Sequence, residues 1–464
     1  MRLRTIAATA LIAASLAASA QAPKYIFYMI GDGMGMGHIT NAQIYNRAVL
    51  HNDTPLTMMQ FPVASFATTH SASSDVTDSA AAGTALATGH KTRNSMLGMN
   101  PDTVAVTSIA KTLFDNGYGI GLITTVAIDD ATPGAFYAHV PNRGEYTTIG
   151  HQLAQSGYQF AAGAGLRGTT DKEGNDTGLL DDFARNGVKI SYGMNTLDTI
   201  APRVLLLSTD TERPWNVGYT IDSIPGALNL PDMTSAGIRH MQRTSPDRFF
   251  MMIESGNIDH AGHANDGGAA IIETLNFDKA IALVHDFYLA HPDETLIVVT
   301  ADHETGGISV GNDHTGYSAP LGALTGQKVS KEVFSDYCKG ILRSRMVYKW
   351  PDMREYLADN LGFWNTVPVT DEQEKEIEEM FDRTFEQRNA APDEETLYAN
   401  FNAFSSLIFK ILNDNAGVGW TTTKHTGAVV PVFAIGAGAE KFSSMRDNTA
   451  IPRTIMEIAG IPME

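Results

Sequence analysis

The chain has 464 residues, which is enough for about three domains or for one large α/β domain. Hydrophobic residues make up 43% and charged residues 18%, a composition that excludes disordered and fibrous proteins and allows a substantial core. The 33 Lys and Arg face 52 Asp and Glu, and the formal charge of −19 excludes a broad nucleic-acid-binding face, which needs a cationic surplus.

The N-terminal segment 1–22 has the pattern of a secretory signal peptide. Arg2 and Arg4 precede an apolar stretch over 6–16, and small residues follow at 18–20. The apolar stretch is shorter than the ~20 residues that a membrane span needs, and no later segment has 18 unbroken apolar residues, so we expect no membrane span. We therefore expect a periplasmic or secreted protein, with residues 23–464 as its catalytic domain. Cys338 is the only cysteine, which excludes an internal disulfide.

Short apolar runs alternate with helical patterns along most of the chain. Such runs are typical of strands covered on both faces, and the alternation predicts an α/β fold with a mostly parallel central sheet sandwiched by helices. The expected strands are 25–30, 119–124, 203–207, 249–253, 295–300 and 431–435, and the expected helices are 80–88, 104–116, 145–156 and 269–289. From about 317 to 417 the pattern changes to helices without buried strands, which predicts a helical insertion whose acidic run, 371–380, is a solvated helix face.

Acidic residues and histidines follow the ends of several predicted strands, where ligands bind in open α/β sheets. The first strand runs into Asp32, between glycines that do not fit a dinucleotide fingerprint, and the later strands run into Glu254 and into Asp302-His303. Asp259 and His263 are four residues apart, so on a helical turn they share one face and can bind one cation. Because buried carboxylates without compensation cost several kcal/mol each, bound divalent cations explain these clusters better than surface salt bridges do.

The segment 76–84 places Ser79 at the start of an Ala-rich helix. A helix N-terminus stabilises negative charge, and a hydroxyl there could attack phosphorus once a metal lowers its pKa. The alternative is that Asp78 or Ser79 only caps the helix.

Together these motifs resemble the alkaline phosphatase family. The resemblance covers the chain from about residue 24 to 435, in the family's order, and rests on Gly-Asp32-Gly, Thr77-Asp78-Ser79-Ala-Ala, Asp130-Ala-Thr132-Pro with Ala138-His139 and Arg143, Glu254 with Asp259 and His263, Ala301-Asp302-His303-Glu304, and Trp420-Thr421-Thr422 with His425-Thr426.

The resemblance implies roles for single residues. It implies that Ser79 becomes phosphorylated and that the fork of Arg143 holds two phosphate oxygens. Its implied metal ligands are Asp259, His263 and His425 for one zinc ion, Asp32, Ser79, Asp302 and His303 for a second zinc ion, and Asp32, Thr132 and Glu254 for a magnesium ion. Asp130 and His260 match positions just outside the third site that influence whether it prefers magnesium or zinc.

The implied activity is hydrolysis of small phosphate monoesters by two in-line displacements, and the implied assembly is a homodimer. A phosphodiesterase of the same superfamily is the alternative enzyme, although the fork of Arg143 matches two unsubstituted phosphate oxygens, which a monoester offers more fully. A phosphate-binding protein without catalysis would lack a nucleophile or metal ligand, and none is missing. The insertion, which resembles the crown or large loop of other members, could instead cap the site of a monomer.

Overall fold

A computed structural model describes residues 22–344 and 347–463. Its described part contains a ten-stranded sheet with the order β16-β2-β15-β8-β1-β7-β3-β4-β6-β5. The strands of this sheet are β1 (Tyr25–Gly31), β2 (Val63–Thr68), β3 (Gly119–Thr124), β4 (Phe160–Gly163), β5 (Lys189–Tyr192), β6 (Val204–Leu207), β7 (Phe249–Ser255), β8 (Thr295–Thr300), β15 (Val430–Gly436) and β16 (Arg446–Asp447). Only β15 runs antiparallel to its neighbours, so the predicted mostly parallel sheet is confirmed.

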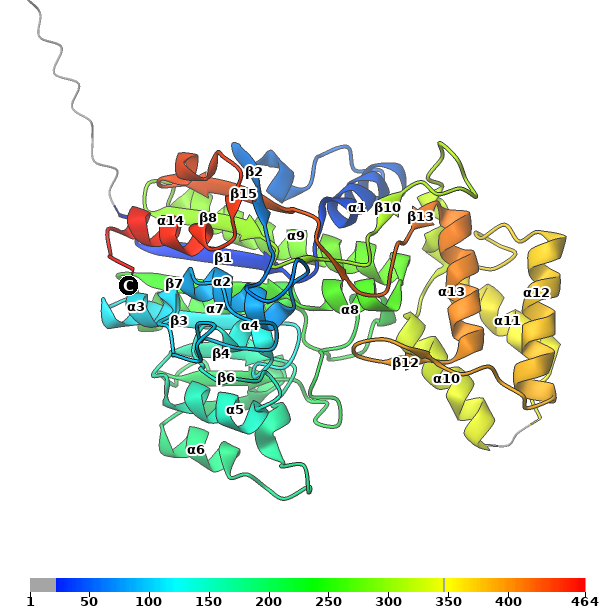
Figure 1. The fold of residues 1–464 in the computed structure, drawn as a ribbon, viewed down its shortest axis with the longest axis horizontal. Coiled ribbons are helices and arrows are strands. Elements are labelled where there is room, and N and C mark those ends of the chain that lie inside the picture. The colour runs from blue at the N-terminus through cyan, green and yellow to red at the C-terminus, as the bar shows by residue number, and fades with distance from the viewer. Residues whose placement is uncertain (1–21, 345–346, 464) are drawn as a thin grey trace, which may run out of the picture.

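Helices cover both faces of the sheet (Figure 1). The helices of the core are α1 (Met36–Ala48), α2 (Ser79–Thr88), α3 (Ile109–Asp115), α4 (Ala131–Gly134), α5 (Tyr146–Gln155), α6 (Leu179–Arg185), α7 (Leu230–Thr244), α8 (Asn257–Ala264), α9 (Gly267–Ala290) and α14 (Ala450–Ala459). Because successive strand residues face opposite sides, Phe27 and Phe249 pack on Phe287 of α9, whereas Tyr28 and Phe250 pack on Phe136 after α4.

One predicted helix begins later than expected. The sequence pattern predicts a helix over 104–116, but α3 starts at Ile109, because the Ser108 side chain accepts a hydrogen bond from the Lys111 amide and caps the helix there. The residues before it are extended, and Ala105 forms an antiparallel bridge with Met99. Three strands of the sheet, β2, β4 and β5, and the short β16 are additions to the six expected ones.

The segment 317–417 contains four α-helices on one side of the core (Figure 1). They are α10 (Lys331–Ser344), α11 (Trp350–Leu361), α12 (Asp371–Phe381) and α13 (Ala403–Ala416). The acidic run forms most of α12, which buries Ile377 and Phe381 and exposes most of its carboxylates. The segment also holds a small hairpin of β11 (Glu394–Glu395) and β12 (Asn400–Phe401), which the sequence analysis does not anticipate.

Two further two-stranded sheets pair segments that follow the main strands with segments from later in the chain. They pair β9 (Glu304–Thr305) with β14 (His425–Thr426), and β10 (Ser309–Val310) with β13 (Val418–Gly419). The first pairing brings His425, from the end of the chain, beside the segment that follows β8. The expected signal peptide, 1–22, lies outside the described residues except for Ala22. Among the residues that are described, no helix is both long and apolar enough to cross a bilayer.

Candidate active site

The carboxyl ends of the central parallel strands bring the predicted acidic residues together. Strand register places Ile30 of β1 beside Glu254 of β7 on one side and Thr300 of β8 on the other. Asp32 follows β1 by one residue and Asp302 follows β8 by two. Three carboxylates from distant parts of the sequence therefore meet at one edge of the sheet, as the rule for open α/β sheets predicts.

The first cluster is the Asp259 trio, formed by Asp259, His263 and His425, whose ligand atoms all lie within 4.8 Å of one another. Asp259 and His263 occupy one face of α8, four residues apart, and His425 arrives on β14. The Nε2 atoms of His263 and His425 are 3.0 Å apart, and Asp259 Oδ2 is 3.4 Å from His263 Nε2.

The tautomers of these two histidines are set by their other nitrogens. His263 Nδ1 is 2.6 Å from the Thr423 carbonyl oxygen and His425 Nδ1 is 2.9 Å from that of Thr77, so each Nδ1 donates a proton. The two Nε2 atoms then face each other and the Asp259 carboxylate. A cation between these atoms would be bound by all three side chains, and a mixed nitrogen and oxygen set suits zinc.

The second cluster is the Asp302 trio, formed by Asp32, Asp302 and His303, and it satisfies the same 4.8 Å criterion. His303 Nε2 lies 3.2 Å from Asp302 Oδ2 and 3.4 Å from Asp32 Oδ1. Gly33, the residue after Asp32, has φ +71°. A Cβ on Gly33 would lie 2.8 Å from Thr305 Oγ1, so glycine is required where this loop passes the site.

Ser79 lies beside the Asp302 trio, with its Oγ 3.2 Å from His303 Nε2 and only 1% of the residue exposed. It is the first residue of α2. The cap of that helix is Asp78, whose Oδ1 accepts a hydrogen bond from the Ala81 amide at 2.9 Å. The capping role therefore belongs to Asp78, which leaves the Ser79 hydroxyl free to face the trio.

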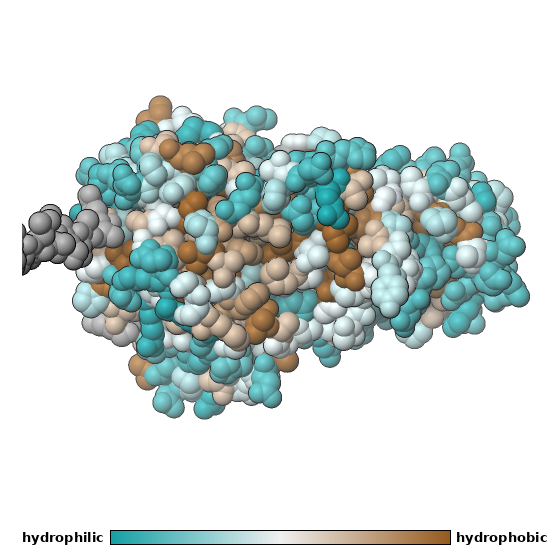
Figure 2. Space-filling view, turned by 90° about the horizontal axis from the view of Figure 1, so that it is seen from above, coloured by the Kyte–Doolittle hydropathy of each residue, from teal (hydrophilic) through white to brown (hydrophobic). Residues whose placement is uncertain are grey.

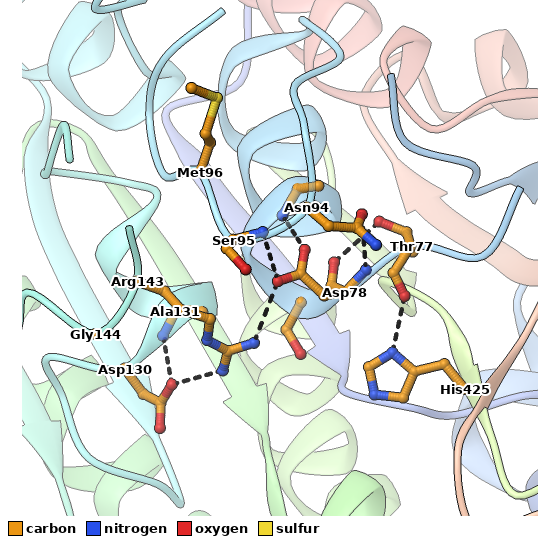
Figure 3. Close-up of polar contacts among 12 residues, drawn as sticks. Thr77, Asp78, Asn94, Ser95, Met96, Asp130, Ala131, Arg143, Gly144 and His425 are labelled. Atoms are coloured by element: carbon orange, nitrogen blue, oxygen red, sulfur yellow. Dashed lines mark hydrogen bonds and ion pairs between the residues drawn. The ribbon is translucent and has the colours of Figure 1, made fainter. Parts of the chain in front are cut away.

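In Figure 3 Arg143 lies on one side of Asp78 and His425 on the other, and the guanidinium lies between the carboxylates of Asp78 and Asp130. Its Nη2 donates to Asp130 Oδ1 at 2.8 Å, and its Nη1 is 3.7 Å from Asp78 Oδ2. Burial works against the charged guanidinium, but the facing oxygens of Tyr398, Asp130 and Asp78 raise the pKa of Arg143. The guanidinium therefore stays charged, with its plane held on two edges.

The third predicted set, Asp32, Thr132 and Glu254, consists of oxygen ligands. Glu254 Oε2 accepts a hydrogen bond from Thr124 Oγ1 at 2.5 Å. Thr132 lies at the start of α4. Burial and the Asp302 and Asp130 carboxylates raise the pKa of Glu254 to about 8, against the opposing effect of the Thr124 hydrogen bond. This carboxyl group strongly resists ionisation unless positive charge is nearby.

The carboxyl groups of Asp32 and Asp302 also have raised pKa values, so their ionised forms require positive charge nearby. Burial and the Asp302, Asp259 and Glu254 carboxylates raise the pKa of Asp32 well above its ordinary value. Burial and Asp259 raise the pKa of Asp302 to about 6. Each expected carboxylate ligand has one buried oxygen without a hydrogen-bond partner: Asp32 Oδ1, Glu254 Oε1, Asp259 Oδ2 and Asp302 Oδ2. The hydroxyl oxygen of Thr132, an expected ligand of the third set, also has none. The donor set thus fits divalent cations at these positions.

Several residues around the site could not be identified from the sequence alone. Arg167 follows β4, which was not predicted, and its Nη1 lies 3.4 Å from Asp130 Oδ2. Thr305 Oγ1 donates to Asp259 Oδ1. Tyr398, from the hairpin of the insertion, stacks on His260 of α8 with ring centroids 4.0 Å apart. Burial lowers the pKa of His260 to about 4, so this predicted neighbour of the third set is a neutral ring.

The fold thus places Ser79 beside two clusters of possible metal ligands, and comparison with known proteins gives the family of the chain. The model of the alkaline phosphatase family matches residues 23–163 and 213–461, so the chain belongs to that family. The expected enzyme class, a phosphoric monoester hydrolase, is thereby confirmed.

Individual relatives match over nearly the whole chain. Alkaline phosphatase 4 of Bacillus subtilis is 30% identical, over 93% of this chain and 88% of the relative. The repressible alkaline phosphatase of Saccharomyces cerevisiae is 26% identical, over 94% and 80%. The crystal structure of a cold-active alkaline phosphatase from a psychrophilic Shewanella superposes with a TM-score of 0.78 at 26% identity, covering 94% of this chain and 99% of that one.

Proposed function

We propose that this chain hydrolyses phosphate monoesters through a phosphoserine at Ser79, with two zinc ions and one magnesium ion bound. The Asp259 trio would hold one zinc ion, and the Asp302 trio, together with the Ser79 hydroxyl, would hold the other. Asp32, Thr132 and Glu254 would hold the magnesium ion, because oxygen ligands alone favour that metal. The unpartnered buried oxygens and the facing Nε2 atoms support this assignment.

The metal ions, when bound, supply Lewis acidity that lowers the pKa of the serine hydroxyl and of water and offsets negative charge on the departing oxygen. Ser79 Oγ forms a bond to phosphorus while the ester bond from phosphorus to the alcohol oxygen breaks. Water then displaces Ser79 Oγ and releases inorganic phosphate. The N-terminus of α2 stabilises the ionised hydroxyl in both displacements.

Arg143 would bind two of the phosphate oxygens that carry no organic substituent. Asp78 and Asp130 hold its plane, and part of its fork of five N–H donors remains for the substrate. A phosphodiester has one such oxygen fewer than a monoester, so the clamp favours monoesters. Asp130 is also paired with Arg167. Burial raises the pKa of Asp130, but Arg143 and Arg167 together hold it below its ordinary value, so the carboxylate stays available to Arg143.

The observation that carries the proposal is the contact between Ser79 Oγ and His303 Nε2, at a helix N-terminus and beside two metal-ligand trios. Ser79→Ala should lower turnover of p-nitrophenyl phosphate by several orders of magnitude, with zinc content and thermal unfolding near those of the wild type. Ser444→Ala, at an exposed serine near the C-terminus, is the control. A Ser79→Ala enzyme with nearly normal turnover would exclude this nucleophile.

The preference for phosphate monoesters over phosphodiesters is tested with the same assay. Wild-type enzyme should turn over p-nitrophenyl phosphate much faster than bis(p-nitrophenyl) phosphate, and the opposite order would favour the phosphodiesterase alternative. We further propose that residues 1–22 direct export to the periplasm or medium and that the enzyme is a homodimer. The N-terminal sequence of the exported protein and its sedimentation mass test these two points.

A further inference from the structure

A cleft with a volume of about 640 Å³ opens beside the Asp259 trio, and its walls come from both the core and the insertion. The core contributes Val76, Asp78, His263 and His425, among others. The hairpin of the insertion contributes three consecutive residues, Glu395 to Leu397. This space is larger than a phosphate group requires, so it can take the organic part of an ester.

The hairpin that forms one wall is held in place at its base. Lys331 at the start of α10 is 3% exposed; its Nζ donates to the Ala264 carbonyl at the end of α8 and pairs with Glu394 Oε2 at 2.7 Å. Ser406 Oγ donates to the same carboxylate at 2.5 Å. In Figure 1 the orange segment that contains β12 reaches from the helices of the insertion to the core near α8.

The tip of the hairpin is seated directly on the site. The ring of Tyr398 stacks on His260, and its centroid is 5.2 Å from that of His263. Because Tyr398 is fixed against α8, the preceding residue, Leu397, is held at the cleft. A wall that is already ordered binds a ligand without the entropic cost of ordering a loop.

The cleft exposes apolar side chains that the protein does not cover. Leu397 is 60% exposed and Val76 is 36% exposed, and both line the cleft. In Figure 2 hydrophobic residues also come to the surface in the middle of the molecule, between the core and the narrower lobe of the insertion, whose visible face is mostly hydrophilic. Burying these two side chains against an apolar ligand is favourable.

The position of the cleft relates it to the bond that breaks. In an in-line displacement the departing oxygen lies opposite the attacking one. Ser79 Oγ contacts His303, whose ring stacks on His425 at 3.6 Å, and His425 and His263 line the cleft together with Leu397. The cleft therefore adjoins the site on the side of the Asp259 trio, where we expect the departing oxygen.

We propose that the tip of the β11–β12 hairpin forms a leaving-group subsite, in which Leu397 and Val76 bind the aromatic part of aryl phosphate monoesters. This subsite rests on the proposed function and names its substrate class. The cleft is also lined by three polar residues, Asn94, Glu395 and Lys424.

The test compares an aryl ester with a small polar one. Leu397→Ala should lower kcat/KM for 1-naphthyl phosphate by about fivefold or more, because it removes apolar contact area from the ring. The kcat/KM for glycerol 2-phosphate and the inhibition constant of inorganic phosphate should change by less than about twofold, since neither ligand has a group that reaches the wall. Leu289→Ala is the matched control, because Leu289 is 61% exposed at the far end of α9.

A second measurement does not depend on turnover. The inhibition constant of phenylphosphonate divided by that of methylphosphonate should lie below one in the wild type, rise toward one in Leu397→Ala, and stay at its wild-type value in Leu289→Ala. Equal losses on both esters, or no loss on the aryl ester, would overturn the subsite while leaving the phosphatase function intact. Wild-type enzyme that hydrolyses neither ester would instead overturn the proposed function.

Discussion

Neighbouring side chains orient the guanidinium group of Arg143. Its two terminal nitrogens face carboxylates from different segments, Asp78 before α2 and Asp130 before α4. These contacts fix the plane of the guanidinium before any substrate arrives. A lysine at the same place would offer one point charge without a plane, and could not hold two phosphate oxygens at once.

Arg143→Lys should therefore raise the inhibition constant of inorganic phosphate by about tenfold to a hundredfold, since it removes one charge-assisted hydrogen bond or more. Competitive inhibition in the steady state measures the effect. Arg167→Lys is the control, because Arg167 pairs with the same Asp130 at 3.4 Å and makes no ion pair with Asp78 among the described residues. An equal change in both variants would contradict the clamp.

Glu273 lies on α9 and is not an expected metal ligand, so it can show how burial of a carboxyl group makes stability depend on pH. It is 1% exposed, its Oε1 accepts a hydrogen bond from the Thr220 amide at 2.6 Å, and burial raises its pKa to about 7. In the unfolded chain the same carboxyl ionises near its ordinary value of 4.5. Between these two values the folded protein binds the proton and the unfolded chain does not, so stability falls as the pH rises.

Glu273→Gln keeps an acceptor oxygen and removes the charge. Relative to the wild type, its free energy of unfolding should rise as the pH goes from about 4.5 to above 7, by up to about 3 kcal/mol. Below pH 4.5 the difference should be small, because the glutamate is protonated in both states. Denaturant unfolding at pH 4.5, 6 and 8 measures this, and a difference that does not vary with pH would refute the assignment.

At the scale of elements, a buried lysine of the insertion donates a hydrogen bond to the core and forms an ion pair within the insertion. Lys331 of α10 connects the last turn of α8 with Glu394 of β11. Burial lowers the pKa of Lys331, and the Glu394 carboxylate opposes this effect. The pair lies where a shift of the hairpin would also move Tyr398 and Leu397.

Lys331→Met should lower the free energy of unfolding by about 1–3 kcal/mol, because Glu394 keeps partial solvent access and the Ser406 hydrogen bond. The double variant Lys331→Met, Glu394→Gln should be less destabilised than the sum of its single variants, since each single variant leaves one charge unpaired and the double variant leaves none. Urea unfolding of the four proteins measures the coupling. Strict additivity would show that the pair contributes nothing.

The central strands can be predicted from the sequence because their own residues show that they are buried. Strands such as β1, β7 and β8 are continuous apolar runs, and a run of that kind indicates burial on both faces. β4 has only four residues, two of them alanine, and β2 exposes alternate residues, so neither gives a continuous apolar run. Short and edge strands are defined by their neighbours in the sheet rather than by their own residues.

The same distinction separates the site residues. Those that follow a predicted strand directly, Asp32, Glu254 and Asp302, can be found from sequence because the end of a parallel strand is a defined place. Arg167, Thr305 and Tyr398 cannot, since their positions depend on a short strand, a two-residue strand and a hairpin of the insertion. Ser79 could be recognised as a candidate, but only the structure shows that its neighbour Asp78 caps the helix.

At the scale of the whole molecule, the expected metal ions would cross-link segments from both ends of the chain. The Asp302 trio joins Asp32 after β1 to the segment after β8, and the Asp259 trio joins α8 to β14. Binding that is specific to the folded state stabilises it by mass action. Chelation should therefore remove activity and lower the melting temperature together, and zinc followed by magnesium should restore both.

His425→Ala removes one ligand of the Asp259 trio and none of the Asp302 trio. Native mass spectrometry should show about one zinc ion fewer per chain than in the wild type, with turnover limited by hydrolysis of the phosphoserine. His314→Ala, at an exposed histidine outside both trios, is the control and should keep the wild-type metal content. Equal zinc content in His425→Ala and the wild type would remove His425 from the site.

The place of β15 in the sheet has a consequence for the order in which the protein folds. This strand lies between β2 and β8 although it comes near the end of the chain, and β14, with His425, immediately precedes it. A chain that emerges from its N-terminus can form β1, β7 and β8 early, but β2 and the Asp259 trio must wait for the last residues. On refolding, activity should thus return after most of the secondary structure, and the catalytic centre is completed only once the chain itself is complete.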